Sequence, residues 1–155
     1  MNLMARQPIF SSLLSCGLGM MMGLSISCTQ RSSPLLISPE VPYGPIVWSP
    51  EESQQDIALK TLRQTPEASF HLIRLKGTER PHVHDHHDLT VFVLSGKARV
   101  HFATRSVEVG PLDIIEIPRG HMHWAENISP GPSVVYVIFT PPFDGKDHRL
   151  IETPT

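Results

Sequence analysis

The chain has 155 residues, 40% of them apolar, which is enough for one packed core of ordinary size but not for two. It carries 13 basic and 15 acidic side chains, for a formal net charge of -2, and no run of Lys or Arg long enough to bind a polyanion, which argues against nucleic acid as a partner. Both cysteines, Cys16 and Cys28, lie near the N-terminus, so no internal disulfide or cysteine-based zinc site can form after Cys28.

The N-terminal segment has the pattern of a bacterial export signal. Met1 to Arg6 carries one positive charge, and Ile9 to Ile26 has no ionisable side chain except the thiol of Cys16. Glycines and serines recur in this apolar stretch, which disfavours a buried helix of the folded domain. We therefore predict an export signal over residues 1–28.

The end of this signal resembles the cleavage site of bacterial lipoproteins, in which the cysteine after the cut is lipidated. Here Ser25-Ile26-Ser27 precedes Cys28, with serine at the position where those proteins usually have leucine. The resemblance implies a lipid on Cys28, which would be the only membrane contact of a protein located in the periplasm or cell envelope. A cleaved signal without a lipid, an uncut anchor and a lipid on Cys16 stay open as alternatives.

Residues 29–48 are rich in Pro and Ser and predict a flexible linker, followed by one domain over residues 49–155. At the start of that domain, Ser49-Pro50-Glu51-Glu52 has the pattern of a capped helix start. Either a short helix continues from there toward Leu62, or Ile57 to Arg63 is already a strand that pairs with Ser69 to Leu75 across a turn.

The rest of the chain predicts short strands separated by Gly- and Pro-containing turns. Strand-forming residues dominate Leu89–Leu94, Ala98–Ala103, Asp113–Ile117 and Ser133–Phe139. Regularly spaced short strands indicate an all-β antiparallel sandwich or barrel. No glycine-rich phosphate loop and no serine nucleophile elbow is present in the sequence, so phosphate-binding and serine-hydrolase functions have no support.

Histidines with the spacing of metal ligands stand between these strands. His82 and His84 are two residues apart, and alternate residues of a strand share a face, so both imidazoles can point into one cavity. Asp88 follows four residues after His84, and His123 follows a predicted strand farther along the chain. Imidazole and carboxylate ligands suit iron, manganese, nickel or zinc.

These residues resemble the two motifs of the cupin superfamily, whose members are small β-barrels. Gly77, His82, His84, Asp88 and Gly96 follow the order of the first motif, with Asp where the family usually has Glu. Pro118, Gly120, His123 and Asn127 match the second motif without a gap. The resemblance covers about residues 69–142 and implies a cupin-type double-stranded β-helix, that is, a jelly-roll barrel.

The resemblance implies that His82, His84 and His123 bind one divalent transition metal ion, with Asp88 as the fourth ligand. The spacing from Asp88 to Gly96 is one residue longer than in the family, and counting back from Gly96 puts Leu89 at the ligand position instead. A barrel that has lost its metal, with the histidines merely lining a pocket, is the alternative interpretation.

Other polar residues carry weaker signals. His86 and His87 could replace Asp88 as ligands, support the ligands, or be solvated loop residues, and His121 shares strand parity with His123. Glu116, Glu126 and Tyr136 are candidate pocket acids or donors without a spacing that favours one of them. The residues interpreted as surface, packing or ordinary loop positions are His71, His101, Trp124, His148 and the exit segment Thr140 to Asp147.

Two functions are consistent with this site. The first is a metal-dependent enzyme, a dioxygenase or an isomerase, acting on a small oxygen-rich organic molecule that coordinates the ion. The second is a non-catalytic module that binds a metal or a small ligand at the cell envelope. A positioned Glu or His near the metal would favour the enzyme, and an entirely apolar surround would favour binding. The resemblance also implies a homodimer.

Overall fold

The computed structural model describes residues 35–39 and 44–152. The predicted export signal and the candidate lipidation sites lie outside these residues. Within the predicted linker, β1 (Leu35–Leu36) pairs antiparallel with β2 (Gly44–Pro45). In the part of the chain that is described, no helix has the length and apolar character needed to cross a membrane.

The predicted helix start is present as α1 (Pro50–Gln54). Ser49 caps this helix, because its side chain accepts a hydrogen bond from the backbone N–H of Glu52 while the Glu52 carboxylate accepts one from the N–H of Ser49. The helix ends at once, since Gln55 already has an extended backbone. The capping signal therefore marked a real helix, but one of only five residues.

The strand interpretation of the next segment is the correct one. β3 (Ile57–Gln64) pairs antiparallel with β4 (Ser69–Leu75), and the Thr65 side chain accepts hydrogen bonds from the N–H groups of Glu67 and Ala68 in the turn between them. A salt bridge of 2.9 Å from Lys60 to Glu52 ties α1 to β3.

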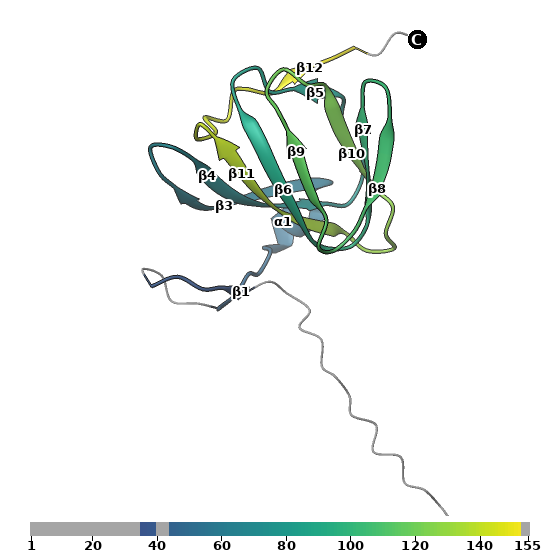
Figure 1. The fold of residues 1–155 in the computed structure, drawn as a ribbon. Helices are drawn as coiled ribbons and strands as arrows, with labels where there is room; N and C mark the ends of the chain where they lie inside the picture. The colour runs from purple at the N-terminus through teal and green to yellow at the C-terminus, as the bar shows by residue number, and fades with distance from the viewer. Residues whose placement is uncertain (1–34, 40–43, 153–155) are drawn as a thin grey trace, which may run out of the picture. The chain divides into compact units, whose positions relative to one another are not determined.

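The remaining strands complete two antiparallel sheets of five strands each (Figure 1). Their bounds are β5 (His82–Val83), β6 (Asp88–Ser95), β7 (Ala98–Phe102), β8 (Ser106–Val109), β9 (Ile114–Ile117), β10 (His123–Asn127), β11 (Ser133–Thr140) and β12 (Arg149–Leu150). One sheet has the order β3-β4-β11-β6-β9 and the other the order β12-β5-β10-β7-β8. The predicted all-β jelly roll is thus confirmed, and within residues 35–39 and 44–152 it carries one short helix.

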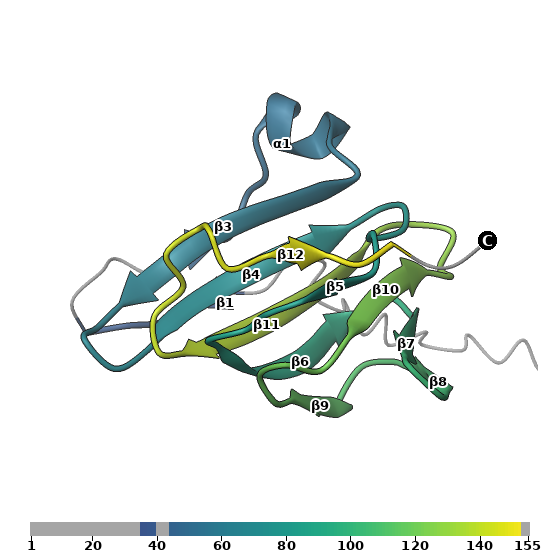
Figure 2. The ribbon, with the colours of Figure 1, turned by 90° about the horizontal axis from the view of Figure 1, so that it is seen from above.

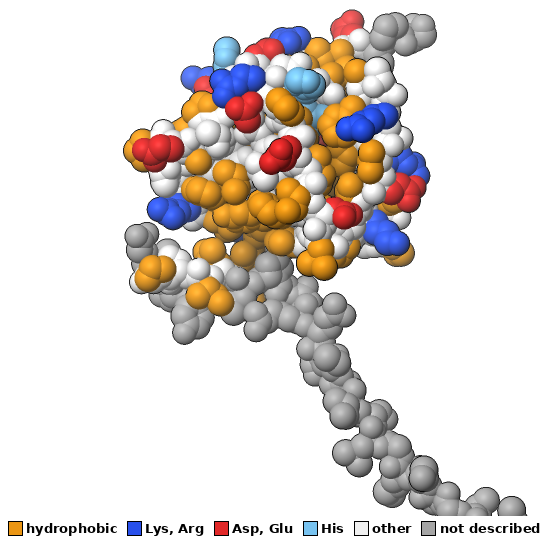
Figure 3. Space-filling view, viewed as in Figure 1, with side chains coloured by type: hydrophobic (Ala, Val, Ile, Leu, Met, Phe, Trp, Pro, Cys, Tyr) orange, Lys and Arg blue, Asp and Glu red, His pale blue; other side chains and the backbone are white. Residues whose placement is uncertain are grey.

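The core lies between the two sheets, which Figure 2 shows from above. Val93 of one sheet packs in the same buried cluster as Val100 and Val109 of the other. Because side chains alternate along a strand, the residues on either side of each core residue point outward. On the surface, hydrophobic side chains gather over the lower part of the face shown in Figure 3. The inward residues thus line the space in which the histidines lie.

The turn between β6 and β7 requires glycine, so we expect Gly96→Ala to lower the free energy of unfolding by about 2–3 kcal/mol. Gly96 has φ +79°, and a Cβ there would lie 2.6 Å from the hydroxyl oxygen and 2.7 Å from the Cα of Ser133. Urea unfolding measures the effect. Gly131→Ala is the matched control, because nothing lies within 4 Å of a Cβ at that position, and equal loss in both variants would contradict the explanation.

Candidate metal centre

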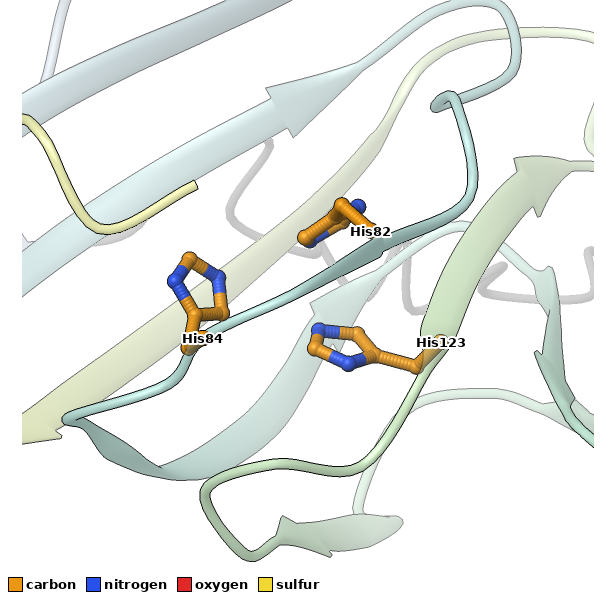
Figure 4. A group of neighbouring side chains, drawn as sticks. All are labelled: His82, His84 and His123. Carbon is orange, nitrogen blue, oxygen red and sulfur yellow. The ribbon is translucent and has the colours of Figure 1, made fainter. Parts of the chain in front are cut away.

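Strand pairing brings His82, His84 and His123 together. His82 begins β5, His123 begins β10, and the two residues are partners in the antiparallel register. His84 lies two residues beyond His82 and shares its face. In Figure 4 the three rings converge on one point.

The three imidazoles are close enough to hold one ion. A potential ligand atom from each lies within 4.8 Å of those of the other two. The ring centres of His82 and His123 are 4.4 Å apart, and that of His84 lies 5.1 Å from His82 and 5.5 Å from His123. All three side chains are buried, with 4–5% of their surface exposed. The triad predicted from the sequence is therefore assembled.

Each ring is oriented by a hydrogen bond from its Nδ1 to a backbone carbonyl. The acceptor is Arg80 for His82, at 2.8 Å, and His121 for His123, at 2.9 Å. For His84 it is the carbonyl of Asp147, which comes from the distant C-terminal segment. Because a carbonyl only accepts, Nδ1 carries the proton in all three rings, and Nε2 keeps its lone pair for a metal.

Burial keeps these imidazoles neutral, which is the form that binds a metal. It lowers the pKa of His84 to about 4 and that of His123 to about 4, and it also lowers the pKa of His82. The neighbouring rings act in the same direction on His84 and His123, because a proton on one repels a proton on the next. The set is therefore ready to bind a cation at neutral pH without first losing protons.

We expect the metal-free protein to lose stability as the pH falls from 6.5 to 4. Unfolded histidines take up a proton near pH 6.5, whereas folded His84 and His123 resist it until about pH 4. In this window the unfolded chain binds more protons, so the free energy of unfolding decreases with decreasing pH. Urea unfolding of chelator-treated protein at several pH values measures the slope. A His84→Gln/His123→Gln double variant should show a flatter profile; a wild-type profile without slope would contradict this explanation.

The structure does not bring Asp88 to the triad, so the geometry does not support its prediction as the fourth ligand. Leu89 faces inward and is buried, and adjacent strand residues point to opposite faces, which turns Asp88 away from the histidines. Its carboxylate instead accepts hydrogen bonds from the backbone and side chain of Arg119, the shortest at 2.6 Å. These bonds lower the pKa of Asp88 to about 2. Counting back from Gly96 puts Leu89 at the ligand position, and Leu89 is the residue that lines the cavity.

Asp147 supports the triad from the C-terminal segment. Besides its carbonyl on His84, its carboxylate accepts hydrogen bonds from the backbone N–H groups of Asp85 and His86, both 2.9 Å long. It also pairs with Nδ1 of His87 at 2.5 Å. Burial alone would raise the pKa of Asp147, but these bonds outweigh it and lower the pKa to about 2. The segment from Thr140 to Asp147 thus holds the loop that follows His84 in place through the side chain of Asp147.

His86 and His87, left open by the sequence, have different roles. His87 is buried, and its Nε2 lies 3.2 Å from the carbonyl oxygen of Pro142, so both its nitrogens face acceptors. It therefore supports the loop and has no nitrogen free for a metal. His86 is exposed and contacts Asp147 only through its backbone N–H.

Two polar residues that line the cavity of the triad were missed by sequence reasoning. Glu79 lines the same cavity as the three histidines, and its carboxylate accepts a 2.8 Å hydrogen bond from the N–H of Ala125. Burial raises the pKa of Glu79. The ring of His148, interpreted from the sequence as a surface or structural residue, lies 4.1 Å from that of His82. Neither residue has a motif spacing, since each reaches the site through a connection between strands.

The other candidates lie away from the triad. Glu116 is exposed, the Glu126 carboxylate lies 3.3 Å from Arg99 and 3.6 Å from His101, and Tyr136 stacks on Phe70 outside the core. His121 is exposed and contributes only its carbonyl to the site.

Two further positions behave as packing residues. The ring of Trp124 borders the cavity and stacks on His101 at 4.5 Å. His71 is buried with one ring nitrogen on Thr61 and the other on Ser69, as expected for a structural histidine.

The triad opens into a cavity of about 460 Å³ that runs between the two sheets. Such a volume is typical of sites for small organic molecules. The residues that line it beside the triad are largely aliphatic, and their polar exceptions include Glu79, Arg80 and His148. The site therefore combines three imidazole rings that could hold a metal ion, one carboxyl group and a sheltered apolar space.

Known proteins resemble this chain in sequence and in structure. A family model described as a cupin domain matches residues 71–139. An uncharacterised protein of Aquifex aeolicus is 37% identical over 102 residues, which are 66% of this chain and 84% of that protein.

Solved structures resemble the fold. KdgF from Halomonas sp. is 27% identical, with a TM-score of 0.54 over 57% of this chain and 82% of that one. The polyketide cyclase RemF from Streptomyces resistomycificus has a TM-score of 0.56 over 68% of this chain and 78% of its own, and at 18% identity it shows the fold alone.

Proposed function

Because this chain belongs to the cupin superfamily, we propose that it is a metal-dependent enzyme acting on a small organic molecule at His82, His84 and His123. The observation that carries the proposal is the shared orientation of the three imidazoles, each with Nδ1 on a carbonyl and Nε2 left free. A merely structural cluster of buried histidines would be expected to satisfy both nitrogens of each ring, as His71 does.

The donor set suits iron, manganese, nickel or zinc. When bound, such an ion supplies Lewis acidity to a carbonyl or enolate oxygen of the substrate, which serves a dioxygenase or an isomerase reaction. The histidines would hold the ion at one end of the cavity, and the aliphatic walls exclude water from the rest of it.

Glu79 is the group that we propose to move a proton. Its raised pKa lets the carboxyl hold a proton more readily than an exposed Glu, and the hydrogen bond from Ala125 fixes its position on the cavity wall. A carboxyl group so placed favours an enzyme over a passive binding module. In a catalytically active preparation, Glu79→Gln should keep the metal content and lower turnover about 100-fold.

Elemental analysis of the purified full-length chain, followed by activity assays, tests the proposal. Oxygen uptake with catechols, diketones and thiols measures dioxygenase activity, and isomerisation of hydroxy-carbonyl compounds is followed by chromatography. We expect about one ion per chain and turnover of at least one of these classes of compound. A chain that retains no ion after incubation with each of the four metals would overturn the metal site, and a loaded chain without turnover would favour the binding module.

That second function has a specific observation in its favour. The cavity wall away from the histidines is nearly all aliphatic, as expected for a site that captures an apolar ligand without transforming it. The Glu79→Gln variant separates the two functions, because a binding module needs no proton transfer and its ligand affinity should survive the exchange.

We propose that the protein is exported to the periplasm or cell envelope, with the lipid on Cys28. The apolar, uncharged stretch before Cys28 supports this location. Fractionation of bacterial cells with detergent phase partitioning tests it. Cys28→Ser should move the protein from the detergent phase to the aqueous phase. Cys16→Ser should leave the protein in the detergent phase. Partitioning of both variants like the wild type would contradict the lipid.

We also propose a homodimer that pairs the outer faces of the β3-β4-β11-β6-β9 sheet. Outward residues on this sheet include an aromatic row, Phe70, Tyr136 and Phe92, and the exposed Leu94 and Ile114. Apolar patches of this kind often mark interfaces. Light scattering of the wild type and of Ile114→Glu tests it, and a wild-type chain that is monomeric at micromolar concentration would contradict the proposal.

A further inference from the structure

Few polar residues line the cavity beside the triad, and they include Glu79, Arg80 and His148. Its aliphatic walls come from both sheets, from β4, β6, β9 and β11 of one and from β7 and β8 of the other. The residues that form these walls include Ile73, Leu89, Val91, Val93, Val100, Ile115, Val135 and Val137. Ser133 also lines the cavity, but its hydroxyl already bonds Lys97 and Asn127, at 2.8 and 2.7 Å.

The approach to the cavity is apolar as well. Ile57 and Leu59 on β3 and Leu150 on β12 line it and keep 39–42% of their surface exposed. Both strands are edges of their sheets, so these side chains have no neighbouring strand on one side. Large aliphatic side chains exposed beside a cavity favour the entry of an apolar molecule.

A hydroxyl-rich molecule such as a polyol fits this space poorly. Hydroxyl groups that coordinate at the triad or contact Glu79 would be satisfied, but any hydroxyl against the aliphatic walls would lose its water without gaining a partner. Each such loss is strongly unfavourable, whereas an apolar group in the same place gains from burial. The walls therefore select against oxygen atoms except at one end of the ligand.

We propose that the cavity takes an amphiphilic molecule with two neighbouring oxygen atoms at one end and an aromatic or aliphatic body. The oxygen end, such as an enolised 1,3-diketone or an ortho-diphenol, meets the triad and Glu79. The body lies between the two sheets. This inference rests on the proposed function for the oxygen end, but recognition of the body depends only on the aliphatic walls.

Calorimetric titration of the metal-loaded full-length chain tests the proposal with three probes that each chelate a metal through two oxygen atoms. Benzoylacetone and acetylacetone use the same 1,3-diketone group, and gluconate uses its carboxylate and a hydroxyl. We expect benzoylacetone to bind at least about 10-fold more tightly than acetylacetone, because its phenyl ring buries apolar area, and gluconate to bind more weakly than either. Gluconate binding as tightly as benzoylacetone, or acetylacetone matching it, would overturn the proposal.

Two variants at neighbouring positions test where the apolar body of the ligand lies. Ile115 lines the cavity, while its neighbour Ile114 points outward and is 60% exposed. Ile115→Phe should weaken benzoylacetone binding at least about 10-fold and leave acetylacetone affinity and metal content unchanged, and Ile114→Phe should change none of them. Equal benzoylacetone affinity in folded Ile115→Phe would overturn the placement.

The metal-free chain distinguishes failure of this inference from failure of the proposed function. Butylbenzene has the apolar body without the oxygen end, so it should bind metal-free wild type and bind metal-free Ile115→Phe more weakly. If the chain holds no metal yet binds butylbenzene in this way, the metal site fails and the apolar cavity stands. If the chain holds metal but butylbenzene does not bind, the substrate class is wrong and the metal site stands.

Discussion

Replacing His123 by alanine is expected to lower the affinity for a divalent metal by at least about 100-fold. Structural zinc sites gain about 10–16 kcal/mol from a full ligand set, so losing one of three protein ligands removes several kcal/mol of binding free energy. The ring to be removed is buried and neutral, so its loss leaves no uncompensated charge and the barrel should still fold. Competition with a chromogenic chelator measures the affinity, and circular dichroism checks the fold.

His121→Ala is the matched control for this experiment. His121 lies two residues away, its side chain is exposed, and only its backbone carbonyl touches the His123 ring. The alanine variant keeps that carbonyl, so its metal affinity should equal that of the wild type. Should His123→Ala bind metal as tightly as His121→Ala, the triad is not the metal site.

Asp147→Asn should lower the free energy of unfolding by about 3–5 kcal/mol and the metal affinity by about 10- to 100-fold. The carboxylate accepts three hydrogen bonds within a buried pocket, one of them from the His87 ring. An amide replaces one acceptor oxygen by a donor NH₂, which then faces another donor. The loop after His84 loses its anchor, and the His84 ring loses part of its orientation.

Asp85→Asn is the control for Asp147→Asn, because it removes the charge of a carboxylate that is exposed to water. Asp85 stands in the same loop and forms two hydrogen bonds to Arg149, at 2.6 and 2.7 Å, but this ion pair is exposed to water. Exposed ion pairs contribute about 1 kcal/mol or less, so we expect little change in either stability or metal affinity. Urea unfolding and chelator competition on both variants measure the difference. Equal effects in Asp85→Asn and Asp147→Asn would contradict the positioning role of Asp147.

Local patterns predicted the fold and the grouping of His82, His84 and His123 for identifiable reasons. Alternation along an extended segment predicts that His82 and His84 share one face, which holds although β5 itself ends at Val83. The second motif places His123 where its strand begins. The capping residues around Ser49 marked α1 because a cap acts over three residues. Residue propensities alone did not decide between helix and strand for Ile57 to Gln64. The segment is a strand because it pairs with β4.

Asp88 shows how a local pattern can mislead. The motif order predicts it as a ligand, but its neighbour Leu89 takes the inner position, as counting back from Gly96 indicates. The partner of Asp88, Arg119, lies in the connection between β9 and β10 and came close only through the pairing of β6 with β9.

By itself the sequence determined the all-β architecture, the capped helix start and the three histidines, because each depends on residues within one strand, turn or motif. Only the tertiary structure decided that Asp147 reaches the loop 60 residues before it, and that Glu79 and His148 line the cavity of the triad. It also decided that the cavity walls are apolar. These features depend on which distant segments meet, and that is set by packing of the two sheets, which spacing along the chain does not encode.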